Sequence, residues 1–168
     1  MTTIPTETLS VFFIILGAIL AAGLPGMGSA RGTSLVGQAA AGVVAEDPSK
    51  FGKVLILQIL PATQGLYGLL IAILTLSTSK VMGGPMPELT WQQGLAFLAA
   101  DLPMAVVGYF SAIHQAKAAA AGVGLVAKRP GESGKAITFA ALVETYAILA
   151  LLVSILALNG LKSTFAIQ

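Results

Sequence analysis

The chain contains no cysteine, and it has only one histidine and one tryptophan among its 168 residues. The absence of cysteine excludes disulfides, thiol catalysis and thiolate-metal sites, and a single histidine excludes a histidine-pair metal site. Charged residues are also scarce, at 10% compared with about 25% in soluble domains. The net charge of +2 is small and dispersed, so no nucleic-acid partner is expected. We find no nucleophile with a partner base and no phosphate-binding loop, so catalysis by this chain alone is not expected.

Long apolar runs take up most of the chain. The composition is 56% hydrophobic and the mean hydropathy is +0.89, values typical of a membrane protein. A helix of about 20 residues spans a hydrocarbon core about 30 Å thick. The runs are too long and too continuously apolar for the strands of a membrane barrel. The sequence therefore predicts an all-α membrane protein with four transmembrane helices at about residues 10–45, 51–79, 92–127 and 134–160.

The charges flanking these runs predict how the chain is oriented. Glu7 rather than a basic segment precedes the first run, which continues past signal-peptide length, so we expect that helix to be retained. Basic residues are concentrated at two short turns, near Pro48 and Pro130. Basic residues favour cytoplasmic loops, so both turns are predicted to be cytoplasmic and both termini outside. The turns hold Lys50, Lys53, Lys128, Arg129 and Lys135, whereas the middle loop and C-terminus hold Lys80 and Lys162.

An internal repeat divides the chain into two halves. "AAAGVVAEDPSKFGK" (39–53) matches "AAAGVGLVAKRPGESGK" (119–135), which has two extra residues in its turn. The match predicts two tandem helical hairpins, residues 1–85 and 86–168. Each hairpin crosses the membrane an even number of times, so the two copies are parallel. Inverted repeats, which are common in alternating-access carriers, need an odd number of crossings.

Small residues are concentrated in the first and third helices. "GLPGMGSARG" (23–32) is followed by "GQAAAG" (37–42), and small residues recur at four-residue intervals from Ala112 to Gly124. Such spacing lets helix backbones approach closely in lipid. The second and fourth helices are bulkier. This division predicts a closed homo-oligomeric ring with the small-residue helices inside, and a compact monomeric bundle is the alternative.

Several polar residues are predicted to share one depth. Thr63 and Gln64 lie 15 and 16 residues after Pro48, while Gln115 lies 15 before Pro130 and Glu144 14 after it. At a rise of about 1.5 Å per residue, all four lie roughly 21–24 Å from the turns, near the membrane centre. Glu144 is the only charged residue between Ala136 and Leu158. Intramembrane acids usually mark an ion or proton pathway.

The second helix presents a matching polar face. Leu60, Thr63, Gln64 and Tyr67 follow helical spacing, and Pro61 is expected to kink the helix and turn the Leu60 carbonyl toward a ligand. Carboxylate, amide, hydroxyl and carbonyl oxygens suit hard cations, and the argument extends to Na⁺. Tyr67 is expected to hold the carboxylate without touching the ion. The structural alternatives are a protonated Glu144 and amides that only link helices.

The other polar residues are less suited to this site. Lys117 lies about 200° around the helix from Gln115, and His114 about 100°, so His114 is expected to be packed or to face a cavity. Asp101, 14 residues or about 21 Å from Gln115, is expected near the outer interface. Arg31 is a candidate to line a central cavity, and Trp91 is a candidate interfacial anchor.

The motifs "LILQILPATQGLYG" (55–68), "HQAKAAAAG" (114–122) and "FAALVETYAIL" (139–149) closely resemble the rotor-ring proteolipid, subunit K or c, of V-type ATPases, especially the sodium-translocating bacterial form. The resemblance implies a ring that turns against a stator membrane subunit, driven through a central-stalk adaptor by a soluble ATPase head, in a bacterial cell membrane. It implies ion ligation by Glu144, Gln115, Gln64, Thr63 and the Leu60 carbonyl, with Tyr67 bonded to the carboxylate. No cofactor is expected, and Na⁺ is the transported ligand.

Three alternatives remain. The same ring could carry H⁺, with the amides as hydrogen-bond partners of Glu144. A small multidrug-type proton antiporter would use a membrane glutamate, but we see neither an aromatic cage nor inverted symmetry. A structural four-helix protein would not need an ordered polar cluster.

A shift of 82 residues aligns Ala62 with Glu144, so the first hairpin lacks the acid and four helices are predicted to carry one ion.

Overall fold

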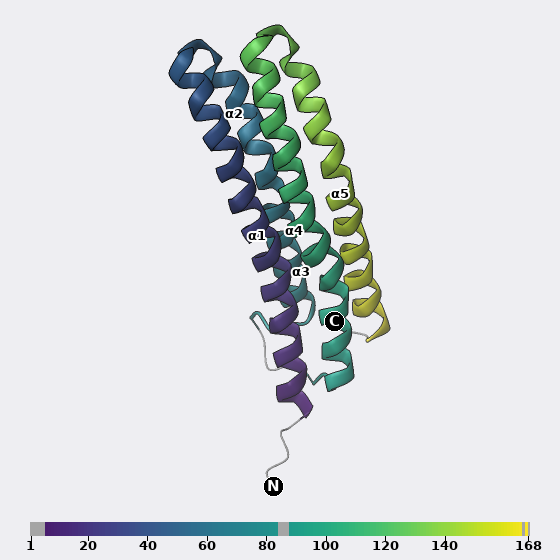
Figure 1. The fold of residues 1–168 in the computed structure, drawn as a ribbon. Helices are drawn as coiled ribbons and strands as arrows, with labels where there is room; N and C mark the ends of the chain where they lie inside the picture. The colour runs from purple at the N-terminus through teal and green to yellow at the C-terminus, as the bar shows by residue number, and fades with distance from the viewer. Residues whose placement is uncertain (1–5, 84–87, 166, 168) are drawn as a thin grey trace.

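The computed structural model describes residues 6–83, 88–165 and 167, and every regular element in that part of the chain is helical. Four long segments run side by side (Figure 1), and each is long and apolar enough to cross a membrane. The all-α prediction is confirmed. The segments are α1 (Thr6–Glu46), α2 (Phe51–Ile59) continued by α3 (Thr63–Thr78), α4 (Trp91–Lys128) and α5 (Ser133–Thr164). The predicted boundary between hairpins, at residues 85 and 86, lies outside the described residues.

Each hairpin turns through a short 3₁₀ helix that begins with proline, η1 (Pro48–Lys50) and η3 (Pro130–Glu132). Proline suits a first helical position because its fixed φ fits a helix and its missing N–H would be unpaired there. Asp47 caps η1: its Oδ1 accepts hydrogen bonds from the Ser49 amide at 3.0 Å and the Ser49 hydroxyl at 2.6 Å. These bonds, led by that of the hydroxyl, hold the pKa of Asp47 below its ordinary value.

The two turns lie next to each other at one end of the bundle (Figure 1). Lys50 Nζ donates to the Ala127 carbonyl at 2.9 Å, and Lys53 Nζ donates to the Pro130 carbonyl at 3.0 Å. Basic residues of the first turn therefore satisfy carbonyls at the end of α4 and in the second turn. This arrangement agrees with two hairpins of the same orientation.

The contact between α1 and α4 is the most extensive between any two elements of the described chain, and glycines allow the two backbones to approach closely there. A Cβ atom at Gly28 would lie 2.7 Å from the Tyr109 carbonyl oxygen, and one at Gly32 would lie 3.1 Å from the Ala112 carbonyl oxygen. Close packing through small residues is typical of membrane helices. These contacts are made within one chain, so these small residues first of all join the two hairpins to each other.

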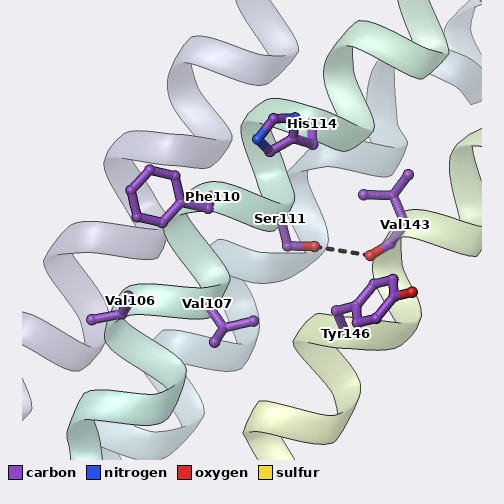
Figure 2. Close-up of a pocket in the computed structure, with 7 residues that line it drawn as sticks. All are labelled: Val106, Val107, Phe110, Ser111, His114, Val143 and Tyr146. Carbon is purple, nitrogen blue, oxygen red and sulfur yellow. Dashed lines mark hydrogen bonds between the residues drawn. The ribbon is translucent and has the colours of Figure 1, made fainter.

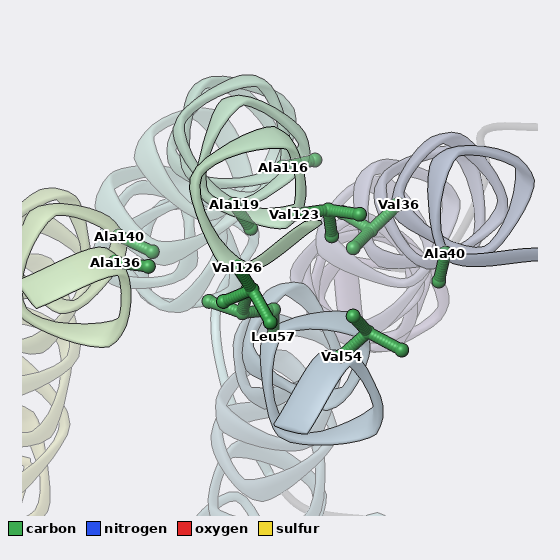
Figure 3. Packing of buried hydrophobic residues seen from close by; sticks show 10 residues of the cluster. All are labelled: Val36, Ala40, Val54, Leu57, Ala116, Ala119, Val123, Val126, Ala136 and Ala140. Atoms are coloured by element: carbon green, nitrogen blue, oxygen red, sulfur yellow. The ribbon is translucent and has the colours of Figure 1, made fainter. Parts of the chain in front are cut away.

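Two apolar clusters fill the bundle, one on each side of a polar layer. The cluster near the turns (Figure 3) joins Leu57 of α2 and Val126 of α4, among others, with alanines of α5. The second cluster lies toward the opposite end and includes Phe97 and Met104 of α4. Along α4, Ser111 and Gln115 fall between the two clusters. The structure therefore encloses these polar side chains in apolar surroundings.

Bulky side chains cover the outer faces of α3 and α5. Leu66 is 64% exposed and Leu156 is 69% exposed. In a membrane protein such faces contact lipid or another protein, because an apolar surface of this kind is unfavourable in water. The large apolar residues exposed on these two helices are Leu66, Leu69, Leu70, Ile73, Phe139, Leu142, Tyr146, Ile148, Leu149, Leu152, Val153 and Leu156.

Candidate ion site at Glu144

The site begins where Pro61 interrupts the second span. The chain forms a 3₁₀ turn, η2 (Leu60–Ala62), between α2 and α3, as expected where proline removes a helical hydrogen bond. Thr63 Oγ1 donates to the Leu60 carbonyl at 3.1 Å, and Gln64 Oε1, at 3.4 Å, is an alternative acceptor for the same hydroxyl. Three oxygens of different chemical types are therefore grouped at this turn.

Glu144 projects from α5 and is half-buried, and both of its carboxylate oxygens accept hydrogen bonds. Tyr67 Oη of α3 donates to Oε1 at 2.6 Å, and Gln115 Nε2 of α4 donates to Oε2 at 3.2 Å. Hydrogen bonds to a charged acceptor are stronger than those between neutral groups. The carboxylate is thus held from two other helices in one orientation.

Gln64 and Gln115 are both fully buried and connect α3 to α4. Gln64 Nε2 donates to Gln115 Oε1 at 2.5 Å and more weakly to Ser111 Oγ at 3.4 Å. Ser111 Oγ in turn donates to the Val143 carbonyl at 3.1 Å, next to Glu144. The buried amides are therefore part of a continuous network that ends at the carboxylate.

When ionised, the Glu144 carboxylate has no ion pair with a basic side chain among the described residues. Within the described ranges, ion pairs are found at the turns, Lys50 with Asp47 and Lys135 with Glu132. An ionised acid in a low-dielectric setting is stable only with a counter-charge or several good donors. Together with the oxygens near Thr63, the geometry suits either a bound cation or a titrating proton.

The structure brings together all the residues predicted at one depth: Glu144, Gln115, Gln64 and Thr63, with Leu60 and Tyr67 beside them. Lys117 is exposed and outside this network. Asp101 also lies outside it, but its carboxyl group is fully buried, a feature that the predicted position near the outer interface did not convey. Arg31 is exposed, and its Nη1 donates to Tyr109 Oη at 2.6 Å.

His114 lies on the outer side of α4 and makes no hydrogen bond in the carboxylate network among the described residues. It lines an apolar pocket of about 360 Å³ between α4 and α5, together with Phe110 and Tyr146 (Figure 2). This placement matches a cavity-facing histidine, the structural expectation for it. The remaining lining residues are Val106, Val107, Ser111 and Val143.

Ser111 is the site residue that the sequence did not single out. A serine among alanines and glycines in a membrane helix is typical of close packing. Its spacing of four residues from Gln115 was the available signal, because residues four apart share a helix face. In the structure it links the Gln64 amide to the backbone of α5.

The fold and site define a membrane protein of paired helical hairpins with a hydrogen-bonded carboxylate in the second hairpin. Comparison with known proteins agrees with this class. A family model for the C subunit of ATP synthase matches the chain twice, at residues 16–75 and 98–157. The chain is an integral membrane protein that belongs to this family, the C subunits of ATP synthases.

Two curated relatives extend over most of the chain. The V-type sodium ATPase subunit K of Enterococcus hirae is 46% identical over 151 residues, which are 90% of this chain and 93% of that protein. The A-type ATP synthase subunit K of Methanocaldococcus jannaschii is 47% identical over 150 residues, 88% of this chain and 63% of that protein. The resemblance to rotor-ring proteolipids seen in the motifs is confirmed.

Proposed function

We propose that the chain is the ion-carrying subunit of a rotor ring in a V-type ATPase, and that each copy carries one Na⁺ at Glu144. The observation that carries this proposal is the geometry of the carboxylate, which is fixed by Tyr67 and Gln115 beside a group of neutral oxygens. The similarity to a V-type sodium ATPase subunit in Enterococcus hirae supports the choice of ion.

The proposed ligands are the Glu144 carboxylate, the side-chain oxygens of Gln115, Gln64 and Thr63, and the Leu60 carbonyl. The Thr63, Gln64 and Leu60 oxygens are already neighbours, since Thr63 Oγ1 lies 3.1 Å from the carbonyl and 3.4 Å from the amide oxygen. Rotation of the Gln115 amide would place its Oε1 where Nε2 now donates, next to Glu144 Oε2. Tyr67 would stay bonded to Glu144 Oε1 and limit the movement of the carboxylate.

Charge neutralisation explains how a site with bound Na⁺ could move past lipid as the ring rotates. An ionised carboxylate without a counter-ion is costly to move through lipid, whereas the same carboxylate with Na⁺ is neutral overall. A loaded copy of the chain could therefore pass the lipid-facing part of a rotation, and the ion would exchange where stator half-channels supply water. One transporting acid, Glu144, per four helices gives one ion per chain in each turn.

The proposed assembly is a homo-oligomeric ring against a stator membrane subunit, with a central-stalk adaptor linking it to a soluble ATPase head. The bulky exposed faces of α3 and α5 are suited to lipid and stator contacts. The basic residues at the two adjacent turns favour a cytoplasmic position for that end, with both termini outside. A bacterial cell membrane is the proposed location.

The same hydrogen bonds would also serve a proton-carrying ring, because Tyr67 and Gln115 can partner either form of an acid. Carbodiimide labelling of the purified ring distinguishes the two ions, since the reagent attacks a protonated carboxyl group. We expect peptide mass spectrometry to locate the adduct on Glu144 and Na⁺ to slow its formation. Labelling that responds to pH but not to Na⁺ would replace sodium with the proton.

A further inference from the structure

A second carboxyl group is buried in the bundle, separate from the Glu144 network. Asp101 of α4 is fully buried, and Thr75 Oγ1 of α3, also fully buried, donates to its Oδ1 at 2.6 Å. Asp101 Oδ2 is the one buried side-chain polar atom without a hydrogen-bond partner in the described part of the chain. The proposed ion path does not use this acid.

The surroundings of Asp101 provide no counter-charge among the described residues. Tyr67 on α3 lies eight residues before Thr75, and Tyr109 on α4 lies eight after Asp101, so each is about two helical turns away. Gly17 of α1 lies against Asp101 Oδ2, and the ionisable side chains of α1 that the structure describes, Arg31 and Glu46, are at least 14 positions from Gly17.

The end of α5 that faces this region adds no charge either. Ser154 Oγ of α5 accepts from the Met104 amide of α4 at 3.3 Å, which places this part of α5 close to Asp101 along the bundle. The basic residues nearest in sequence to the C-terminal ends of α3 and α5 are Lys80 and Lys162, and both are exposed. An ionised Asp101 would therefore have Thr75 as its one described donor.

The backbone of α1 closes one side of Asp101 Oδ2 to a metal ion. A Cβ atom placed on Gly17 would lie 2.5 Å from Asp101 Oδ2 and 3.0 Å from Leu98 Cα, so the oxygen rests directly against α1. A Na⁺ ion needs several oxygens around it, and the described contact offers carbon on that side. A proton needs no such volume.

We propose that Asp101 is a proton-binding site, and that its neutral acid form joins α1, α3 and α4. Oδ1 accepts from Thr75, and a proton on Oδ2 would turn that unpartnered oxygen into a donor, for which the second lone pair of a helix carbonyl is a suitable acceptor. This arrangement satisfies both oxygens, whereas an ionised carboxylate would leave a buried charge with one donor. The transported ion therefore remains one per chain, although each chain has two membrane acids.

Infrared spectroscopy of the assembled protein at neutral pH tests this directly. The Glu144→Gln variant is the background, so that Asp101 is the remaining acid in the interior of the four described spans. We expect a carbonyl-stretch band of a protonated carboxylic acid in this background and its loss in Glu144→Gln/Asp101→Asn. A band that is absent, or that survives Asp101→Asn, overturns the proposal. Because Glu144 is already removed, either result leaves the sodium proposal unaffected.

Thr75→Val provides a readout that a purely structural role would not change. The acid band should move to higher frequency, because the hydrogen bond to Oδ1 is lost while the proton remains. Asp101→Asn alone should keep thermal stability close to wild type, since its amide still accepts at Oδ1 and donates at Nδ2. Asp101→Leu, which does neither, should be less stable. Equal stability of the Asn and Leu variants would contradict the proposed joining of the helices.

Discussion

Tyr67 and Glu144, 77 residues apart and in different hairpins, are joined by a 2.6 Å hydrogen bond from the phenol to carboxylate Oε1. The bond ties the hairpin that lacks a membrane acid to the one that has it. Gln115 holds the other oxygen from α4, so the two partners fix the carboxylate from different helices. The first hairpin thus contributes to the site although Ala62 stands where the repeat has Glu144.

Tyr67→Phe should weaken ion binding without destroying the site. The lost bond is to a charged acceptor, worth about 1.5–3 kcal/mol, so the Na⁺ concentration that half-protects Glu144 from carbodiimide should rise about ten- to a hundredfold. Tyr146→Phe is the matched control, because Tyr146 is 66% exposed and lies in the outer pocket. Equal shifts in the two variants would show that the phenol at Tyr67 has no special role.

Glu144→Gln should abolish ion-coupled ATP turnover in the intact complex and leave the ring assembled. The amide keeps the shape of the side chain but removes the charge that the cation requires. Asp101→Asn is the comparison, and it should retain most activity because Asp101 lies outside the network. Turnover and native mass spectrometry measure the two properties separately. Comparable losses in both variants would refute the assignment of one transporting acid.

The helices were predictable because each appears in the sequence as a long, uninterrupted run of apolar residues. In lipid, every backbone polar group needs an internal partner, so a long apolar run predicts a helix with few alternatives. The turn prolines then fix where each run ends. The contacts between α1 and α4 were harder to predict from the sequence, because small residues indicate close packing but do not identify the helix they pack against. The stretch "GLPGMGSARG" (23–32) predicts close packing in a ring, and the structure places its Gly28 against Tyr109 of the same chain.

The grouping of Glu144, Gln115, Gln64 and Thr63 followed from counting residues from the turns, since a rigid helix converts sequence distance into depth. Depth alone does not say in which direction a side chain points around the axis of its helix, or which neighbouring helix it faces. For that reason the link through Ser111 and the burial of Asp101 against Gly17 required the structure. Both depend on how α4 is rotated relative to its neighbours.

Gly28→Ala should destabilise the folded chain by about 1–3 kcal/mol, the usual cost of overpacking. The added methyl would lie 2.7 Å from a carbonyl oxygen of α4, and backbone cannot move aside as a side chain can. Gly26→Ala, two residues away with nothing within 4 Å of its new Cβ, is the control and should be neutral or slightly stabilising. Thermal unfolding in detergent compares them, and matching midpoints would argue against close α1–α4 packing.

The first turn should lose local protection in acid. The pKa of Asp47 is lowered from 3.8 by its hydrogen bonds to Ser49, so its stabilising effect is complete above that value and fades as the pH falls through the lower folded value. The protection factor of the Ser49 amide in hydrogen exchange measures this. Asp47→Asn keeps an accepting oxygen without the charge, so its protection should not vary with pH in this range. Identical pH profiles would contradict the capping role.

Ion identity is tested most sharply by the neutral oxygens. A Na⁺ site needs several oxygens around an ionised carboxylate, whereas a proton site needs only the acid and a hydrogen-bond partner. Na⁺ should therefore slow carbodiimide modification of Glu144, and the protection should grow at higher pH, where fewer protons compete for the carboxylate.

Gln64→Ala and Gln115→Ala should each raise the Na⁺ concentration needed for protection while labelling of Glu144 continues, because each removes an oxygen but not the acid. His114→Ala is the control, since His114 lines the outer pocket, and it should leave the protection curve unchanged. In a proton ring, the amide variants would shift the pH dependence of labelling and show no effect of Na⁺ at any pH. That outcome would assign the ring to protons, with Gln115 as the hydrogen-bond donor to Glu144 that the structure shows.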